Sequence, residues 1–116
     1  MNLYQEEILD HYKHPRNKGR LAHSTSSGEA SNPLCGDRLG LDIVVKNGLV
    51  EEVGFWGEGC AISQAAMSMV SEQVIGQSVE DLKKLSKDDV LELLGVDVGP
   101  SRLKCALLCL SVIERV

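Results

Sequence analysis

Three cysteines and one aspartate occupy positions in the sequence where a side chain can take part in chemistry. Cys35 and Asp37 lie within the turn-forming stretch NPLCGDR, Cys60 precedes a helical pattern, and Cys105 lies near the start of the last one. Thiolates and carboxylates bind zinc and iron, and a thiolate is also a nucleophile. A cysteine can also be a small buried apolar residue. Spacing alone leaves both readings open, because no paired CxxC occurs.

The composition narrows the class of protein. The chain has 116 residues, which predicts a single domain spanning 1–116, and a net charge of −5, which argues against a nucleic-acid partner. No apolar run is long enough for a bilayer, and the N-terminus has no apolar signal core. Four cysteines without an export signal favour a reducing, cytoplasmic location, where clustered thiols bind metals or react.

The pattern of the N-terminal third predicts one helix and a long loop. The helix is expected from a cap at Asn2 to about Tyr12, because Pro15 prevents its continuation. The region from Arg16 to Cys35 is rich in serine, glycine and asparagine, and we expect a loop there.

A β-hairpin is expected next, with an Asn-Gly pair at its turn. With a two-residue turn, apolar side chains oppose acidic ones. A three-residue loop, Lys46–Gly48, instead pairs Leu39 with Phe55 and Leu41 with Val53. We therefore expect the three-residue loop, since a slip of one residue would turn the apolar face to water.

The remaining sequence predicts four helices. The first follows Cys60 and ends at Gly76; two short ones are capped by Ser78 and Ser86; the last begins near Pro100. A helix, then a small sheet, then several helices constitute an α+β domain.

This order of elements brings the reactive side chains together. The open ends of a hairpin are adjacent, so Cys35, Asp37 and Cys60 are expected to be neighbours. The N-terminal end of the last helix can add Cys105, which gives a donor set of three sulfurs and one oxygen for a tetrahedral ion or an iron–sulfur unit. A helix N-terminus also favours the thiolate of Cys60.

Other candidate residues are assigned structural roles. Cys109 lies in the middle of the last helix on an apolar stripe and is interpreted as a core residue. His11, His14 and His23 show no metal-ligand spacing and are interpreted as exposed polar residues.

Four motifs together resemble a known family. ILDHYKHPRNKG, NPLCGDR, GEGCAIS and RLKCA are similar to the signatures of the iron–sulfur cluster assembly scaffolds IscU, SufU and the N-terminal domain of NifU. The resemblance runs from about Leu3 to the end of the chain. It implies a three-stranded antiparallel sheet with helices packed on it.

The resemblance also implies a function. Cys35, Asp37, Cys60 and Cys105 would bind zinc or hold a [2Fe–2S] cluster, and the three cysteines are candidate acceptors of persulfide sulfur from a cysteine desulfurase. The cluster would pass to apo iron–sulfur acceptor proteins, a scaffold role rather than an enzymatic one. The alternative is a zinc-dependent sulfurtransferase of the SufU type.

The sequence departs from the family patterns at two places. IscU members carry a histidine at the position of Lys104. SufU members have a lysine there, as this chain does, and the positive charge of the lysine would support a nearby thiolate. Where IscU members carry a Leu-Pro-Pro-Val-Lys chaperone segment, this chain reads VGPSR, residues 98–102, which argues against an Hsp70-type partner. The short connection from Cys60 to Cys105 is similar to that of IscU. The sequence is also compatible with a homo-oligomer.

Overall fold

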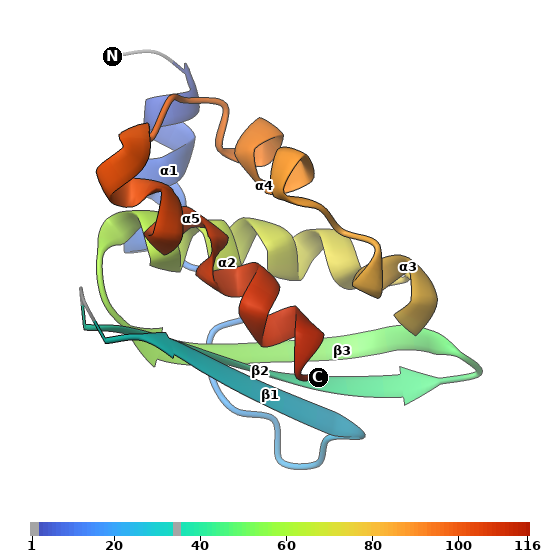
Figure 1. Cartoon of the computed structure of the whole chain (residues 1–116). Coiled ribbons are helices and arrows are strands. Elements are labelled where there is room, and N and C mark those ends of the chain that lie inside the picture. Colours follow the sequence, from blue (N-terminus) through green and yellow to red (C-terminus); the bar gives the residue numbers. More distant parts are fainter. Residues whose placement is uncertain (1–2, 34–35) are drawn as a thin grey trace.

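A three-stranded antiparallel sheet lies on one side of the molecule and five helices lie on the other (Figure 1). The computed structural model describes residues 3–33 and 36–116, so the cap predicted at Asn2 and the site residue Cys35 lie outside the described residues. The expected α+β class with a three-stranded sheet is confirmed. The elements, in chain order, are α1 Leu3–Lys13, β1 Ser26–Asn32, β2 Asp37–Lys46, β3 Leu49–Glu58, α2 Ala61–Val74, α3 Val79–Lys83, α4 Lys87–Leu94 and α5 Gly99–Glu114.

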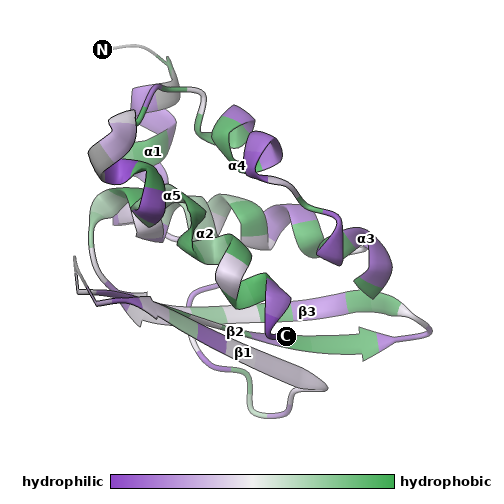
Figure 2. Ribbon diagram, viewed as in Figure 1, coloured by the Kyte–Doolittle hydropathy of each residue, from purple (hydrophilic) through white to green (hydrophobic). Residues whose placement is uncertain are grey.

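The helices form two layers over the sheet. α2 and α5 contact the strands, whereas α1 packs on α2, and α4 packs on both α2 and α5 (Figure 1). Apolar side chains of α2, α5, β2 and β3 meet between the layers, where Figure 2 shows most of the apolar colour. Phe55 is the aromatic residue of this core, which otherwise consists of aliphatic, alanine and sulfur-containing side chains.

The expectation of a loop from Arg16 to Cys35 is wrong in part, because this region contains β1. The strand sequence, SSGEASN, has few β-favouring residues, and β1 forms only by pairing with β2. Gly28 allows that position, because a side chain there would collide with the C-terminal turn of α5. Ala30 is the apolar residue of β1 that joins the core.

The hairpin register also differs from the expectation. Lys46 pairs with Leu49, so the turn has two residues, Asn47 and Gly48, both with positive φ. A bulge between Val44 and Val45 then shifts the register, so that Leu41 faces Phe55 and Ile43 faces Val53. Because of the bulge, the hairpin has the favourable two-residue turn and still keeps its apolar side chains on the face that packs against the helices.

The outer face of the sheet is crossed by the segment 17–25, which we call the strap. It starts at the free edge of β3, where the backbones of Asn17 and Gly19 bond to Phe55, and ends where Thr25 N–H donates to Ile43 (Figure 1). Gly54 leaves room for the strap, because a Cβ there would meet the carbonyl of Gly19.

A buried carboxylate fixes the strap to the sheet. Asp42 is 1% exposed and accepts hydrogen bonds from Arg20 Nε, the backbone N–H of Leu21 and Ser27 Oγ. Arg20 also stacks on the Trp56 ring, with its guanidinium carbon 3.7 Å from the ring centroid.

The short helices begin and end as the sequence predicts. Ser78 and Ser86 accept hydrogen bonds from the backbone N–H groups of Asp81 and Asp89, and Gly95 ends α4 with a left-handed φ of 67°. α5 carries its proline in the first turn. Among the described residues, no helix combines the length and the apolar character needed to cross a membrane.

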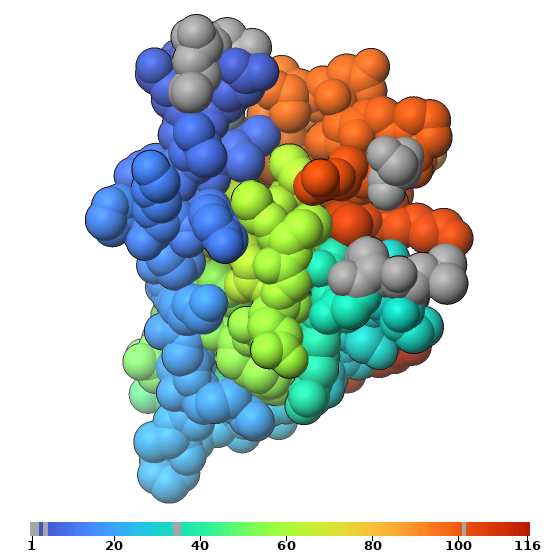
Figure 3. Space-filling view, turned by 90° about the vertical axis from the view of Figure 1, so that its left-hand side faces the viewer, coloured from blue at the N-terminus to red at the C-terminus, as the bar shows by residue number. Residues whose placement is uncertain are grey.

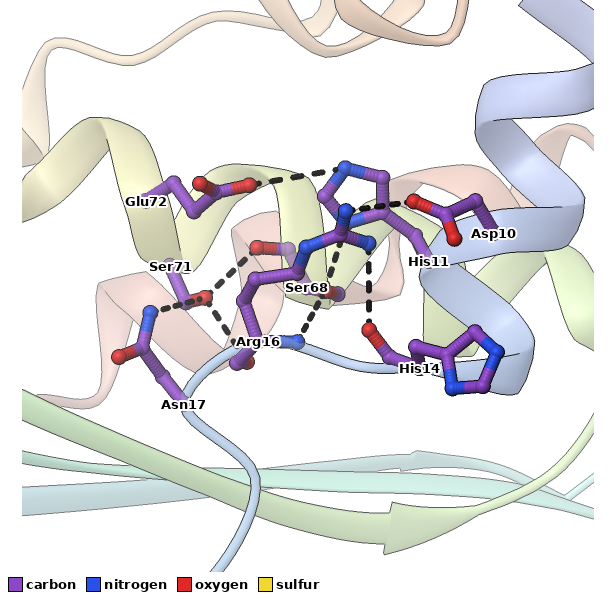
Figure 4. Close-up of polar contacts among 8 residues, drawn as sticks. All are labelled: Asp10, His11, His14, Arg16, Asn17, Ser68, Ser71 and Glu72. Atoms are coloured by element: carbon purple, nitrogen blue, oxygen red, sulfur yellow. Dashed lines mark hydrogen bonds and ion pairs between the residues drawn. The ribbon is translucent and has the colours of Figure 1, made fainter.

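The interpretation of His11 as an exposed residue is wrong. The residue is 9% exposed, and its Nδ1 lies 2.7 Å from the hydroxyl of Ser68 on α2 (Figure 4). The same hydroxyl accepts a hydrogen bond from the backbone N–H of Arg16, and Glu72 lies 3.5 Å from His11 Nε2. Buried serines on α2 therefore anchor the end of α1.

Candidate metal centre

Asp37, Cys60 and Cys105 converge at one end of the sheet. Their ligand atoms all lie within 4.8 Å of one another, although they come from the start of β2, the N-cap of α2 and the second turn of α5. Arg38 pairs with Glu58 across the hairpin, which places the residues on either side of its open end together. This adjacency does not depend on the turn, so the convergence holds although the expected register was wrong.

Asp37 and Cys60 are joined by two contacts. The backbone N–H of Cys60 donates to Asp37 Oδ1 at 2.8 Å, and the Cys60 thiol lies 3.7 Å from Oδ2. Asp37 is 1% exposed. Gly59, with φ of 145°, makes this approach possible, because a Cβ at that position would overlap the Asp37 carboxyl.

The donor set suits a small tetrahedral ion. Bonds of about 2.0–2.3 Å to zinc place neighbouring sulfur and oxygen ligands about 3.5–3.8 Å apart, and the separation of 3.7 Å between Cys60 Sγ and Asp37 Oδ2 matches. Two sulfurs and a carboxylate oxygen would thus hold zinc or one iron of a cluster, with one position left for a further ligand. Cys35, the predicted fourth ligand, lies outside the described residues.

The thiols differ in their access to solvent. Cys60 is partly exposed, whereas Cys105 is 4% exposed. Cys109 is fully buried among apolar residues, and this burial raises the pKa of its thiol to about 12. The interpretation of Cys109 as a core residue is therefore confirmed.

Lys104 lies next to Cys105 in the sequence, but its side chain is exposed. It lines a groove of about 310 Å³ between α5 and the end of β1, beside Asn32, Pro33 and Leu107. Among the described residues it makes no hydrogen bond or ion pair, so its support of a thiolate stays a prediction.

Gln64 is a residue near the site to which the sequence analysis assigned no role. It lies one turn after Cys60 and is 5% exposed, and neither its amide nitrogen nor its amide oxygen has a hydrogen-bond partner. An unpaired buried polar group costs about 1–3 kcal/mol. The signal in the sequence was a glutamine in a stretch of α2 where small and apolar residues predominate.

Comparisons with known proteins agree on one family. The family model described as "NifU-like N terminal domain" matches residues 3–116. The zinc-dependent sulfurtransferase SufU of Bacillus subtilis is 37% identical, with 97% of this chain and 88% of the relative covered. The iron–sulfur cluster assembly scaffold protein IscU of Escherichia coli is 32% identical, with 96% and 88% covered.

Solved structures give the same result. The crystal structure of a putative iron–sulfur cluster assembly scaffold protein for the SUF system, from Fervidobacterium islandicum, superposes with a TM-score of 0.80 at 27% identity, covering 94% of this chain and 92% of that one. The resemblance drawn from the four motifs is therefore confirmed, and this chain belongs to the NifU-like N-terminal domain family.

Proposed function

We propose that this chain is a scaffold on which a labile [2Fe–2S] cluster is assembled and from which it passes to apo-acceptor proteins. The observation that carries the proposal is the convergence of Asp37, Cys60 and Cys105 within 4.8 Å, at the end of the sheet. The printed names of the IscU and SufU relatives support it. Cys35 would complete the ligand set.

A ligand set that combines thiolates with a carboxylate suits a cluster that must be released to another protein. Thiolates bind iron strongly, whereas a carboxylate is a harder ligand that exchanges more readily. Asp37 would therefore be the ligand that an incoming acceptor displaces first. The partial exposure of Cys60 supports transfer directly at the protein surface.

Sulfur would arrive as a persulfide on a cysteine desulfurase. A thiolate of this chain attacks the outer sulfur, a new S–S bond forms, the donor's S–S bond breaks, and the donor cysteine leaves as a thiolate. Cys60 is the favoured acceptor among the described thiols, because Cys105 is more deeply buried. Cys35 stays a candidate acceptor.

A second candidate is a zinc-dependent sulfurtransferase, with zinc held by Cys35, Asp37, Cys60 and Cys105. The 37% identity to the SufU relative favours it. That alignment spans 130 positions, which exceeds the 116 residues of this chain, so the relative carries inserted residues that are missing here. This difference favours the scaffold.

One experiment separates the two candidates. Metal-free protein is incubated anaerobically with iron, cysteine and a cysteine desulfurase, and then with apo-ferredoxin. A scaffold gives visible absorption that moves to the ferredoxin. Tight zinc binding and faster desulfurase turnover, without a coloured species, would instead establish the sulfurtransferase.

The proposal also defines partners and location. A cysteine desulfurase and apo iron–sulfur proteins are the expected partners, and the expected location is the cytoplasm. The segment 98–102, VGPSR, precedes Cys105 on the first turn of α5, and we do not assign it to an Hsp70-type chaperone.

A further inference from the structure

A small cavity lies between α1, α2 and α4. It has a volume of about 160 Å³, and its lining residues are Glu7, His11, Met69, Glu72, Gln73 and Leu93. Figure 3 shows α1, within the blue N-terminal segment, directly against the yellow-green start of α2. Glu72 follows Cys60 by 12 residues, which is about 18 Å along a helix, so this cavity is separate from the candidate metal centre.

His11 and Glu72 face each other at this cavity. His11 Nε2 lies 3.5 Å from Glu72 Oε1 (Figure 4). An N–H···O hydrogen bond is usually shorter, about 2.7–3.2 Å. A nitrogen and an oxygen that share a tetrahedral ion, with bonds of about 2.0–2.2 Å, lie about 3.3–3.5 Å apart. The two atoms are therefore already spaced as ligands of one metal ion.

The surroundings of His11 orient its ring for metal binding. Nδ1 lies 2.7 Å from Ser68 Oγ, which can accept the Nδ1 proton and so leave the Nε2 lone pair toward the cavity. Metal-bound histidines commonly donate from their second nitrogen in this way. Within residues 3–33 and 36–116, Nε2 makes no hydrogen bond, although His11 is only 9% exposed. A buried ring nitrogen is thus directed at the cavity without a hydrogen-bond partner.

Carboxylates dominate the charges around Nε2. Glu7 precedes His11 by four residues, a spacing that places both side chains on one helix face, and it lines the same cavity. Glu7 and Glu72 are exposed and make no hydrogen bond within the described residues, so both carboxylates can turn toward an ion. Arg16 brings a positive charge near the ring, but its guanidinium is paired with Asp10. One imidazole and two carboxylates suit a divalent first-row metal ion.

We propose that this cavity binds such an ion, with His11 and Glu72 as preformed ligands and Glu7 as a third ligand that turns in. Water would complete the coordination, because a volume of 160 Å³ holds an ion and several water molecules of about 30 Å³ each. No thiol takes part, so the site does not depend on the proposed scaffold function. The ion would fasten α1 to α2.

The first test uses Mn²⁺, because this ion prefers oxygen ligands to thiolates. Mn²⁺ is added in less than one equivalent to metal-free wild-type protein, and paramagnetic broadening of the amide signals is followed by NMR. The amides of residues 7–11 and 69–73 should broaden before those of residues 61–63, which adjoin the candidate metal centre. Uniform broadening, or broadening that starts at residues 61–63, would overturn the proposal.

The second test compares Glu72→Gln with Glu80→Gln, which removes the same charge from an exposed position on α3. Because both glutamates are exposed, both variants should fold. We expect Glu72→Gln to weaken Mn²⁺ binding by about tenfold or more, and Glu80→Gln to change it by less than about twofold. Equal weakening by the two variants would mean that Mn²⁺ is attracted only by the general negative charge, and would overturn the site.

Urea unfolding provides a readout of the clamp between α1 and α2. A ligand that binds only the folded state stabilises it, so Mn²⁺ should raise the unfolding free energy of the wild type and of Glu80→Gln above their values in a chelator. The same addition should leave Glu72→Gln nearly unchanged. Equal stabilisation of all three proteins would contradict a role for the cavity ligands.

Discussion

At the scale of single residues, Asp37 has two roles that its position combines. It fixes the start of α2 through the N–H of Cys60, and it faces the same point as the sulfurs of Cys60 and Cys105. A cation at this site would offset the desolvation cost of holding a buried carboxylate within 4.8 Å of two thiols. The residue-scale predictions therefore concern this carboxylate and the glycine that admits it.

Replacing Asp37 by alanine should slow the release of a cluster. The variant loses the ligand that exchanges most readily, so transfer to an apo-ferredoxin should be several-fold slower once the cluster has formed. The measurement is the transfer rate followed by visible absorption. Asp88→Ala, which removes an exposed carboxylate on α4, is the control, and equal rates for the two variants would contradict the exchange role.

Replacing Gly59 by alanine should damage the centre more than its backbone strain alone predicts. The new Cβ would overlap Asp37, whereas Gly76→Ala introduces an alanine at a φ of 90° with open space around it. Both variants should lose about 1–3 kcal/mol of unfolding free energy from the strained backbone. Only Gly59→Ala should also lower zinc affinity, by about tenfold or more, in a competition titration with a chelator.

At the scale of the elements, the sequence predicted the helices better than the strands. Caps at Ser78 and Ser86 are local signals, and the hydrogen bonds form as expected. β1 could not be found in this way, because its pairing with β2 compensates for a sequence with little preference for a strand. The bulge at Val44 was missed because periodicity arguments assume an unbroken register.

The candidate site was predictable for a topological reason. Residues at the open end of a hairpin are close whatever its turn, so Asp37 and Cys60 were expected to be neighbours without coordinates. The surroundings of His11 and Gln64 were not predictable from periodicity. The burial of His11 depends on how α1 packs against α2, and that contact includes the hydroxyl of Ser68, a residue type that also fits an exposed helix face.

Ser68 should be an important residue for the α1–α2 contact. Its hydroxyl bonds to His11 Nδ1 and to the backbone N–H of Arg16, so Ser68→Ala leaves two groups without their partner (Figure 4). We expect a loss of about 1–3 kcal/mol in urea unfolding. Ser111→Ala, on α5, removes a half-buried hydroxyl that makes no hydrogen bond within the described residues and should cost less than half as much.

At the scale of the whole molecule, two buried titratable groups fasten the N-terminal segment to the rest of the fold. His11 holds the end of α1 on α2, and Asp42 holds the strap on the outer face of the sheet. Burial and the nearby charge of Arg16 lower the pKa of His11, although Glu72 partly opposes them. Burial opposes ionisation of Asp42, yet hydrogen bonds from Arg20, Ser27 and the backbone of Leu21 lower its pKa overall.

The lowered pKa of His11 predicts a loss of stability in mild acid. The unfolded chain binds a proton near the ordinary value of 6.5, before the folded protein does. The contribution of His11 is therefore complete above 6.5 and is lost as the pH falls through the lower, folded pKa. Urea unfolding from pH 7.5 to 5 should give a steeper pH dependence for the wild type than for His11→Asn. An equally steep pH dependence in the two proteins would contradict this role of His11.

Asp42 should affect stability over a separate pH range, more acidic than that of His11. Its folded pKa lies below the ordinary value of 3.8, so its contribution is present above 3.8 and is lost as the pH falls through the folded pKa. Asp42→Asn should remove this acid dependence.

The same Asp42→Asn substitution should also destabilise the protein at pH 7, because a neutral amide loses the charge-assisted hydrogen bonds to Arg20 and turns an N–H₂ group toward other donors. Hydrogen exchange at pH 7 should then show faster exchange of the Leu21 and Thr25 amides, while the amides in the middle of α5 stay protected. An equal increase in both regions would mean that Asp42 stabilises the whole fold rather than the strap.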